Sequence, residues 1–110
     1  MNEVDPQMLK GLVTLLLLHL LAESEDYGYA LVVRLRDAGF GDMAEGTVYP
    51  ALARLEQAKR VDTYLVPSDK GPARKYYRIT AAGQLELERT RTAWNHLTGL
   101  VAGLTQGETS

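Results

Sequence analysis

The first apolar stretch of the chain predicts a helix from Pro6 to about Ala22. Asp5 suits its N-cap, and Pro6 suits the first helical position because the N–H that proline lacks has no partner there. Leucines cover more than one face of this helix, which a small domain cannot bury alone. We therefore expect part of its surface, including Leu12 and Leu16, to contact a second subunit.

Two further stretches repeat apolar residues at helical spacing. One runs from Tyr27 to about Ala38, with Asp26 as its cap and Gly39 as a left-handed terminator. The other runs from about Glu45 to Lys59, and its core-facing positions are Val48, Leu52 and Leu55. Pro50 lies early in this third helix, where a proline removes at most one hydrogen bond.

The middle of the chain changes to a strand pattern. Residues 61–66 and 74–79 are rich in Val, Tyr and Ile, and the turn-forming segment PSDKGP separates them. This order predicts a β-hairpin. Tyr76 and Tyr77 are adjacent on its second strand and should point to opposite faces, one to the core and one to the surface.

A last helix is predicted from about Ala81 to Leu104, with Thr80 as its cap. Apolar residues recur on it at heptad spacing, which is typical of a helix that packs along another helix. Together with the two leucines of the first helix, these residues predict a homodimer interface made of Leu12, Leu16, Leu87, Trp94, Leu97, Val101 and Leu104.

The order helix, helix, helix, hairpin, helix predicts a mainly α protein with a small β-hairpin: a winged helix-turn-helix with an added C-terminal dimerisation helix. We assign residues 1–80 to the winged helix-turn-helix DNA-binding domain and residues 81–105 to the dimerisation helix. Residues 106–110 are expected to form a flexible tail. In such a fold the third helix lies in the major groove and the hairpin, or wing, reaches neighbouring phosphates.

Composition narrows the classes of function. The chain has 110 residues, enough for one domain, and no cysteine, which excludes disulfides and cysteine-based zinc sites. Its most apolar run, residues 12–21, is about half as long as a membrane span needs. The N-terminus is acidic and lacks the basic n-region and the small-residue cleavage site of a secretory signal. We therefore expect a cytoplasmic protein without a membrane partner.

Charge is distributed unevenly along the chain. Residues 45–80 carry seven basic and four acidic side chains, a local charge of +3, although the whole chain has a net charge of −2. All four charged side chains from Lys70 to Arg78 are basic. A surface that binds a polyanion would therefore be confined to one face of an acidic protein. Glu56, inside this region, is expected to pair with a basic residue of the wing.

Three segments carry a family resemblance: YGYALVVRLRDAG, EGTVYPALARLE and GPARKYYRITAAG. In this order and at this spacing they resemble the PadR family of transcriptional regulators, in particular the small subfamily with one C-terminal helix. The resemblance covers about residues 9–104. It implies a dimeric repressor that binds double-stranded DNA at a palindromic operator and is released by a small phenolic or amphipathic effector.

The resemblance also assigns residues. The recognition-helix motif and the basic wing match the family, as does the aromatic pair Tyr27 and Tyr29. With Arg54 added from the charge pattern, the predicted DNA-binding residues are Tyr27, Thr47, Tyr49, Pro50, Arg54, Lys70, Arg74 and Lys75. Two positions depart from the family. Ala44 replaces a capping residue, and Lys59-Arg60 replaces an acidic-Gly pair at the end of the third helix.

Trp94, the only tryptophan, lies on the predicted seam. It is either plain interface packing or part of an apolar space between subunits where a flat aromatic effector stacks. The chain shows no nucleophile and base pair, no P-loop and no set of metal ligands around His19 or His96, so we expect neither an enzyme nor a metal or cofactor site. The alternative function is a winged-helix protein-interaction module without sequence-specific DNA binding.

Overall fold

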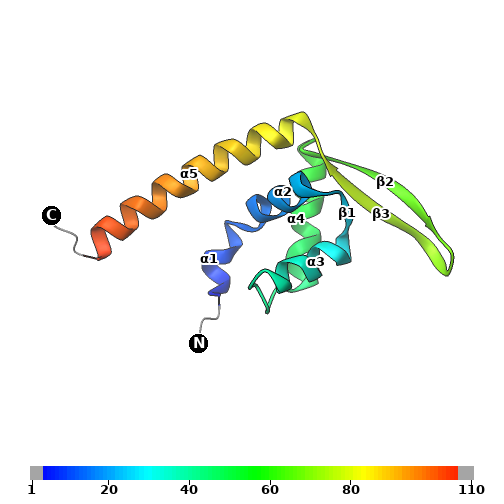
Figure 1. Cartoon of the computed structure of the whole chain (residues 1–110), viewed down its shortest axis with the longest axis horizontal. Coiled ribbons are helices and arrows are strands. Elements are labelled where there is room, and N and C mark those ends of the chain that lie inside the picture. Colours follow the sequence, from blue (N-terminus) through cyan, green and yellow to red (C-terminus); the bar gives the residue numbers. More distant parts are fainter. Residues whose placement is uncertain (1–3, 107–110) are drawn as a thin grey trace.

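The structure, a computed structural model, describes residues 4–106. Within that range five helices and three strands follow one another along the chain. Their bounds are α1 Pro6–Lys10, α2 Val13–Glu23, β1 Asp26–Tyr27, α3 Gly28–Asp37, α4 Glu45–Gln57, β2 Val61–Ser68, β3 Gly71–Ile79 and α5 Ala81–Thr105. The hairpin β2–β3 projects from one side of the helical cluster and α5 from the other (Figure 1). The predicted fold class, a winged helix-turn-helix with a long C-terminal helix, is confirmed.

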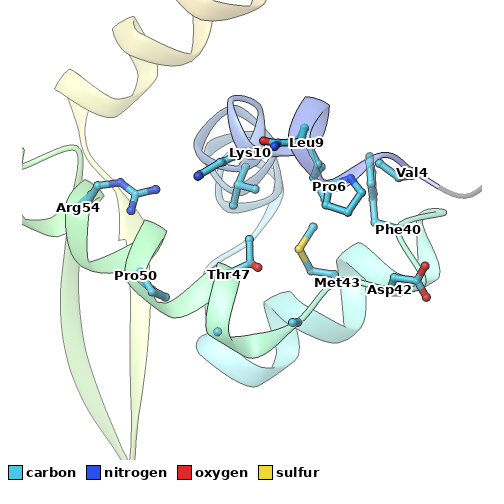
Figure 2. Close-up of a pocket in the computed structure, with 14 residues that line it drawn as sticks. Val4, Pro6, Leu9, Lys10, Phe40, Asp42, Met43, Thr47, Pro50 and Arg54 are labelled. Atoms are coloured by element: carbon cyan, nitrogen blue, oxygen red, sulfur yellow. The ribbon is translucent and has the colours of Figure 1, made fainter.

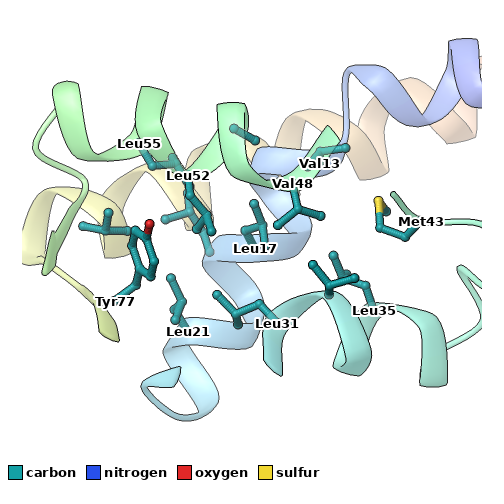
Figure 3. Close-up of a cluster of buried hydrophobic side chains, with 14 of the residues drawn as sticks. Val13, Leu17, Leu21, Leu31, Leu35, Met43, Val48, Leu52, Leu55 and Tyr77 are labelled. Atoms are coloured by element: carbon teal, nitrogen blue, oxygen red, sulfur yellow. The ribbon is translucent and has the colours of Figure 1, made fainter. Parts of the chain in front are cut away.

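The core lies where α2, α3 and α4 turn one apolar face each toward the others (Figure 3). The three core positions predicted on α4 are among its members. Tyr77 of β3 closes the core beneath the sheet, whereas Tyr76 is only half-buried on the opposite face, as the alternation predicts. The buried cluster consists of Val13, Leu17, Leu18, Leu21, Leu31, Val32, Leu35, Met43, Val48, Ala51, Leu52, Leu55, Val61, Tyr77 and Leu87.

The predicted first helix is in fact two helices. Asp5 and Pro6 open α1 as expected, since the Asp5 carboxylate accepts a hydrogen bond of 2.8 Å from the Gln7 N–H. The chain then leaves the helix at Gly11 and Leu12, and α2 begins at Val13. Glycine weakens a helix interior by about 1 kcal/mol relative to alanine, so this is the position at which the helix breaks most easily. The break turns α1 toward the loop that precedes α4.

Asp26 does not cap a helix that starts at Tyr27. Both residues instead form β1, which pairs with Tyr76 and Tyr77 and makes β1-β3-β2 a three-stranded antiparallel sheet. The Asp26 carboxylate accepts hydrogen bonds from the Tyr27 N–H at 3.0 Å and from the Arg34 guanidinium at 3.3 Å. Two residues are too few for a strand pattern, so only the long-range pairing reveals this strand.

The wing is longer than its sequence pattern predicts. Strands β2 and β3 pair in register from Val61 with Ile79 to Ser68 with Gly71, and an irregularity lies between Val66 and Ser68. Pro67 fits within β2 because this strand is an edge of the sheet, where a missing N–H need not break the ladder. The predicted turn segment therefore lies largely within the strands.

Helix α4 ends two residues before the predicted position, in a tight turn that the unusual pair Lys59-Arg60 supports. Lys59 has a φ of 61°, in the left-handed region that glycine normally occupies. The Arg60 N–H donates to the Leu55 carbonyl at 2.9 Å, and the Lys59 N–H donates to the Glu56 carbonyl at 3.0 Å. The turn thus has the left-handed geometry that glycine favours, and lysine bears the steric cost of a Cβ at positive φ.

The start of α5 is fastened to this turn. Thr80 caps α5 as predicted, and its hydroxyl also donates to the Lys59 carbonyl at 2.8 Å. The Thr80 N–H donates to the Arg60 carbonyl at 3.1 Å. A Cβ on Gly83 would lie 2.1 Å from that same carbonyl oxygen, so only glycine permits the contact. Glu86 adds an ion pair with Arg60 at 3.4 Å.

The seam predicted on α5 divides into two parts. Leu87 is 3% exposed and belongs to the core of its own chain, because the first turns of α5 pack against α2. The prediction that Leu87 lies in the subunit interface was therefore wrong. Beyond it the helix leaves the body (Figure 1), and its large apolar side chains are exposed. These are Trp94, Leu97, Leu100, Val101 and Leu104. The predicted tail lies outside the described residues except for Gln106.

We expect Lys59→Gly to stabilise the fold by about 0.5 to 1 kcal/mol, because it removes the Cβ strain at positive φ and keeps the turn. Lys59→Ala is the matched control, since it removes the same charge but keeps the Cβ. Urea unfolding followed by circular dichroism would give both free energies of unfolding. Equal stability of the glycine and alanine variants would contradict the strain argument.

Candidate nucleic-acid interface

Helix α4 has one face in the core and the opposite face at the surface. Val48, Ala51, Leu52 and Leu55 are buried, and the four residues predicted on this helix to bind DNA are all exposed. Pro50 is accommodated inside the helix, as expected. Because a helix presents different residues to its two flanks, the exposed positions separate into a group beside α1 and a group beside the wing.

The group beside α1 consists of Thr47, Pro50 and Arg54, at spacings of three and four residues. These side chains line a hollow between α4, α1 and the loop before α4 (Figure 2). No side chain caps α4, which agrees with the alanine at position 44. The start of the helix is held instead by Arg36, whose Nε donates to the Met43 carbonyl at 2.9 Å.

On the wing flank, α4 is fastened to β3 by an ion pair. The Lys75 ammonium donates to Glu56 Oε1 at 3.0 Å, and the Thr63 hydroxyl donates to Glu56 Oε2 at 3.3 Å. The predicted pairing of Glu56 with a basic wing residue is confirmed. The pKa of Lys75 is raised above its ordinary value, mainly because its ammonium donates a hydrogen bond to Glu56. Lys75 therefore stays charged at neutral pH while part of its charge is compensated.

The other two predicted wing cations have different surroundings. Arg74 lies over the ring of Tyr27, with 4.5 Å between the guanidinium carbon and the ring centroid. Lys70 lies in the turn at the exposed tip of the wing. Among the described residues, neither side chain takes part in an ion pair. Both cations are therefore available to an external anion, more so than Lys75.

A row of aromatic rings crosses the outer face of the sheet and continues from Arg74. Tyr27 and Tyr76 have ring centroids 5.5 Å apart, and Tyr76 and Tyr64 have centroids 5.6 Å apart. Arg78 closes the row, 4.9 Å from the centroid of Tyr64. Such pairs contribute about 0.5 to 1.5 kcal/mol each beyond area burial, so the row stiffens the base of the wing. Tyr27, predicted to bind DNA, thus also has a structural role.

A notch of about 390 Å³ lies between α4, the N-terminus of α3 and β3. Gly28 forms part of its lining, and a Cβ there would lie 2.4 Å from Cε1 of Tyr49. No side chain caps α3, so its first backbone N–H groups carry the positive end of the helix dipole without a side-chain acceptor. The remaining lining residues bring four phenol hydroxyls and two cations: Tyr27, Tyr29, Tyr49, Tyr77, Arg74 and Lys75.

Tyr49 and Tyr77 of this notch stay protonated at neutral pH because the pKa of each is raised. The pKa of Tyr49 is raised above its ordinary value, mainly by burial and further by the negative charge of Glu45. Burial likewise raises the pKa of Tyr77, against a smaller opposing effect of Lys75. Neutral phenols can donate hydrogen bonds, so a notch with phenol donors and cations is chemically suited to a phosphate oxygen.

The structure thus brings most of the predicted DNA-binding residues to one side of the protein. Tyr27, Tyr49, Arg74 and Lys75 share the notch, whereas Thr47, Pro50 and Arg54 share the hollow on the other flank of α4. No role was predicted for Gly28, although the motif YGY contained the signal: a glycine between two aromatic residues at the start of a helix. Only the fold shows that Tyr49 fills the space that a side chain would take.

Two further classes of site receive no support from the described part of the chain. No group of three or more His, Asp or Glu side chains in residues 4–106 is placed to hold a metal ion. Within the same range no helix has both the length and the apolar character needed to cross a membrane.

Comparisons with known proteins agree with this geometry. The model of the transcriptional regulator PadR-like family matches residues 17–89. The chain is 36% identical to the transcriptional regulator Rv3488 of Mycobacterium tuberculosis over 97 residues, 86% of each protein. It is 39% identical to a PadR-like transcriptional regulator of Bacillus cereus, with a TM-score of 0.80 over 93% of this chain and 99% of that one.

A PadR family regulator of Eggerthella lenta has a TM-score of 0.84 at 31% identity, over 93% of this chain and 88% of that one. The relatives are described as transcriptional regulators and not as enzymes, as the sequence analysis expected. A family model that covers more than half of the chain, together with such identities over nearly its whole length, decides the assignment: the chain belongs to the PadR-like family of DNA-binding transcriptional regulators.

Proposed function

We propose that this regulator is a homodimeric repressor that binds a palindromic operator and leaves it when a small effector binds. One observation carries the proposal: within residues 4–106 the chain presents a recognition helix beside a basic wing and, at its other end, a helix face with exposed apolar side chains. A palindrome is read by two such halves related by a two-fold axis. Repression would follow from steric blocking of a promoter.

The exposed seam of α5 supports the dimer. Trp94 is 39% exposed, Leu97 51% and Leu100 59%, on a helix that extends beyond the core. Large apolar side chains gathered on one exposed face are typical of a protein interface. A second copy of α5, packed along the same face, would bury them on both subunits. The described chain extends about 60 Å along its longest axis, and two recognition helices about 34 Å apart would fit successive major grooves.

The notch between α3 and the wing supports phosphate binding. Phosphate contacts commonly come from Arg, Lys and Tyr side chains and from helix N-termini, all of which the notch contains. Lys70 at the wing tip would add a second contact further along the backbone. Thr47 on the exposed face of α4 is suited to base edges because a threonine offers both a hydroxyl and a methyl group. The phosphate contacts fix the register of the protein on the duplex, and the contacts to base edges read the sequence.

Release by an effector requires a ligand whose affinity differs between the dimer that fits DNA and the dimer that does not. Trp94 remains the predicted ligand-stacking residue, since its partly exposed indole is the only aromatic ring among the exposed seam residues of α5. A change in the spacing of the α5 helices would be passed to α4 through the fastened turn at Thr80.

Replacing Arg74 or Lys70 by alanine should weaken binding to every duplex and reduce the slope of log affinity against log salt by about 1 each. Lys75→Ala should reduce the slope less, because Glu56 already compensates that charge. Thr47→Ala should leave the slope unchanged and alter the preference among operator sequences. Fluorescence anisotropy with labelled duplexes at several salt concentrations would measure these effects. Unchanged slopes for the two wing variants would contradict the phosphate role.

Gly28→Ala should weaken DNA binding while the fold persists, because the new methyl group displaces the half-exposed ring of Tyr49 from the notch. We expect a loss of about tenfold in affinity, the size of one or two charge-assisted hydrogen bonds. Gly99→Ala is a matched control for glycine loss within a helix, since Gly99 lies on α5 and nothing lies within 4 Å of its added Cβ. An effect on stability alone, with unchanged affinity per folded molecule, would refute the role of the notch.

Replacing both Leu97 and Val101 by glutamate should convert the dimer into a monomer, because two carboxylates cannot be buried in an apolar seam without partners. The monomer should lose most operator affinity and keep weak non-specific binding. Analytical ultracentrifugation would give the mass, and the anisotropy assay the affinity. Leu85→Glu is the control, since Leu85 is also exposed on α5 but lies outside the heptad positions. A dimer that survives the double substitution would exclude this seam as the interface.

A further inference from the structure

The hollow between α1 and α4 has the size of a small-molecule site. Its volume is about 530 Å³, within the 300 to 1,000 Å³ that ligand pockets commonly occupy. The wall is mainly apolar, with contributions from Leu9, Val13, Phe40, Met43 and Pro50. Three separate segments supply these side chains: α1 with the start of α2, the loop before α4, and α4 itself (Figure 2). The break at Gly11 is what places α1 over this space.

The charged side chains that line the hollow have opposite signs at its two ends. Lys10 of α1 and Arg54 of α4 extend toward each other at one end (Figure 2). Within residues 4–106 neither cation takes part in an ion pair. Asp42 lies at the other end, beside Phe40 and Val4. Two cations that face each other repel unless an anion lies between them, so this end favours an anionic group.

We propose that this hollow binds a small carboxylate with an apolar body, whose acid group lies between Lys10 and Arg54 and whose body contacts the apolar wall. The site lies on one chain, away from the seam of α5. The apolar wall argues for such a ligand over a bare phosphate, because a phosphate would gain nothing from Phe40, Met43 and Leu9. The guanidinium of Arg54 matches the planar geometry of a carboxylate.

Occupancy of this site would exclude DNA, a consequence that rests on the proposed function. Thr47 and Pro50 belong both to the wall of the hollow and to the exposed face of α4 that would enter the major groove. A carboxylate held by Arg54 would also place a negative charge beside that face, where DNA phosphates approach. The ligand would therefore act on the recognition helix directly, without any change in the dimer.

The test is a titration of the whole chain with octanoate, followed by NMR of ¹³C-methyl-labelled methionine. Met43 lines the hollow, whereas Met8 is 74% exposed and does not, so the chain carries its own reference signal. We expect the Met43 methyl signal to shift and saturate while the Met8 signal stays in place. Lys10→Gln and Arg54→Gln should each weaken octanoate binding by about tenfold. Arg91→Gln removes one charge on α5, outside the hollow, and should leave octanoate binding unchanged.

Two control ligands separate the contribution of the acid group of octanoate from that of its apolar body. Acetate has the charge without the apolar body, and 1-octanol has the body without the charge, so both should bind at least tenfold more weakly than octanoate. A Met43 signal that does not move, or moves only together with Met8, would overturn the site. Equal affinity for octanoate and 1-octanol would overturn the role of the two cations.

The exclusion of DNA is tested by anisotropy with octanoate and with acetate at equal concentration, which keeps ionic strength the same. Octanoate should lower duplex affinity and acetate should not. Equal affinity in both would overturn the exclusion. A protein that binds no duplex under any condition would contradict the proposed function and the exclusion with it, while the Met43 titration, done without DNA, still decides whether the hollow binds carboxylates.

Discussion

The whole arrangement depends on the contact between the turn that ends α4 and the start of α5, which the wing separates along the chain. Two backbone carbonyls at that turn, those of Lys59 and Arg60, accept hydrogen bonds from Thr80, and Gly83 lies directly against the second of them. These contacts fix the direction in which α5 leaves the body relative to the recognition helix. The distance between two recognition helices in a dimer would therefore follow from how the α5 helices pack. The cost is a lysine at a φ of 61°, a conformation that the hydrogen bonds around it maintain.

The recognition helix has two chemically different flanks. On the wing side, Glu56 and Lys75 join α4 to β3, and phenol hydroxyls and cations surround an open notch. On the α1 side, an apolar hollow ends in two cations. The first flank is suited to the DNA backbone and the second to an amphipathic anion. An acidic protein thus concentrates positive charge on both sides of one helix, where a polyanion and a small acid would compete.

Much of the fold was predictable because it follows from local rules. Thr80, Asp5 and Gly39 mark helix ends, and the apolar spacing of Val48, Leu52 and Leu55 identifies the buried face of α4. The alternation around Tyr76 and Tyr77 gave their faces correctly. The DNA-binding residues came from charge distribution and from the family motif, and their individual roles stay predictions. The errors occur where a long-range contact decides, as at the two-residue strand β1 and at Leu87.

The sequence by itself determined the order of the main helices and the wing, the charge asymmetry and the family, because propensity, periodicity and motif spacing are properties of neighbouring residues. Only the tertiary structure decided which apolar side chains of α5 remain free, since packing against α2 buries Leu87 and leaves Trp94 and Leu97 exposed. It also decided that Gly28 must lack a side chain and that Lys10 faces Arg54 across a hollow. Those facts depend on residues far apart in the chain, whose distances no local pattern encodes.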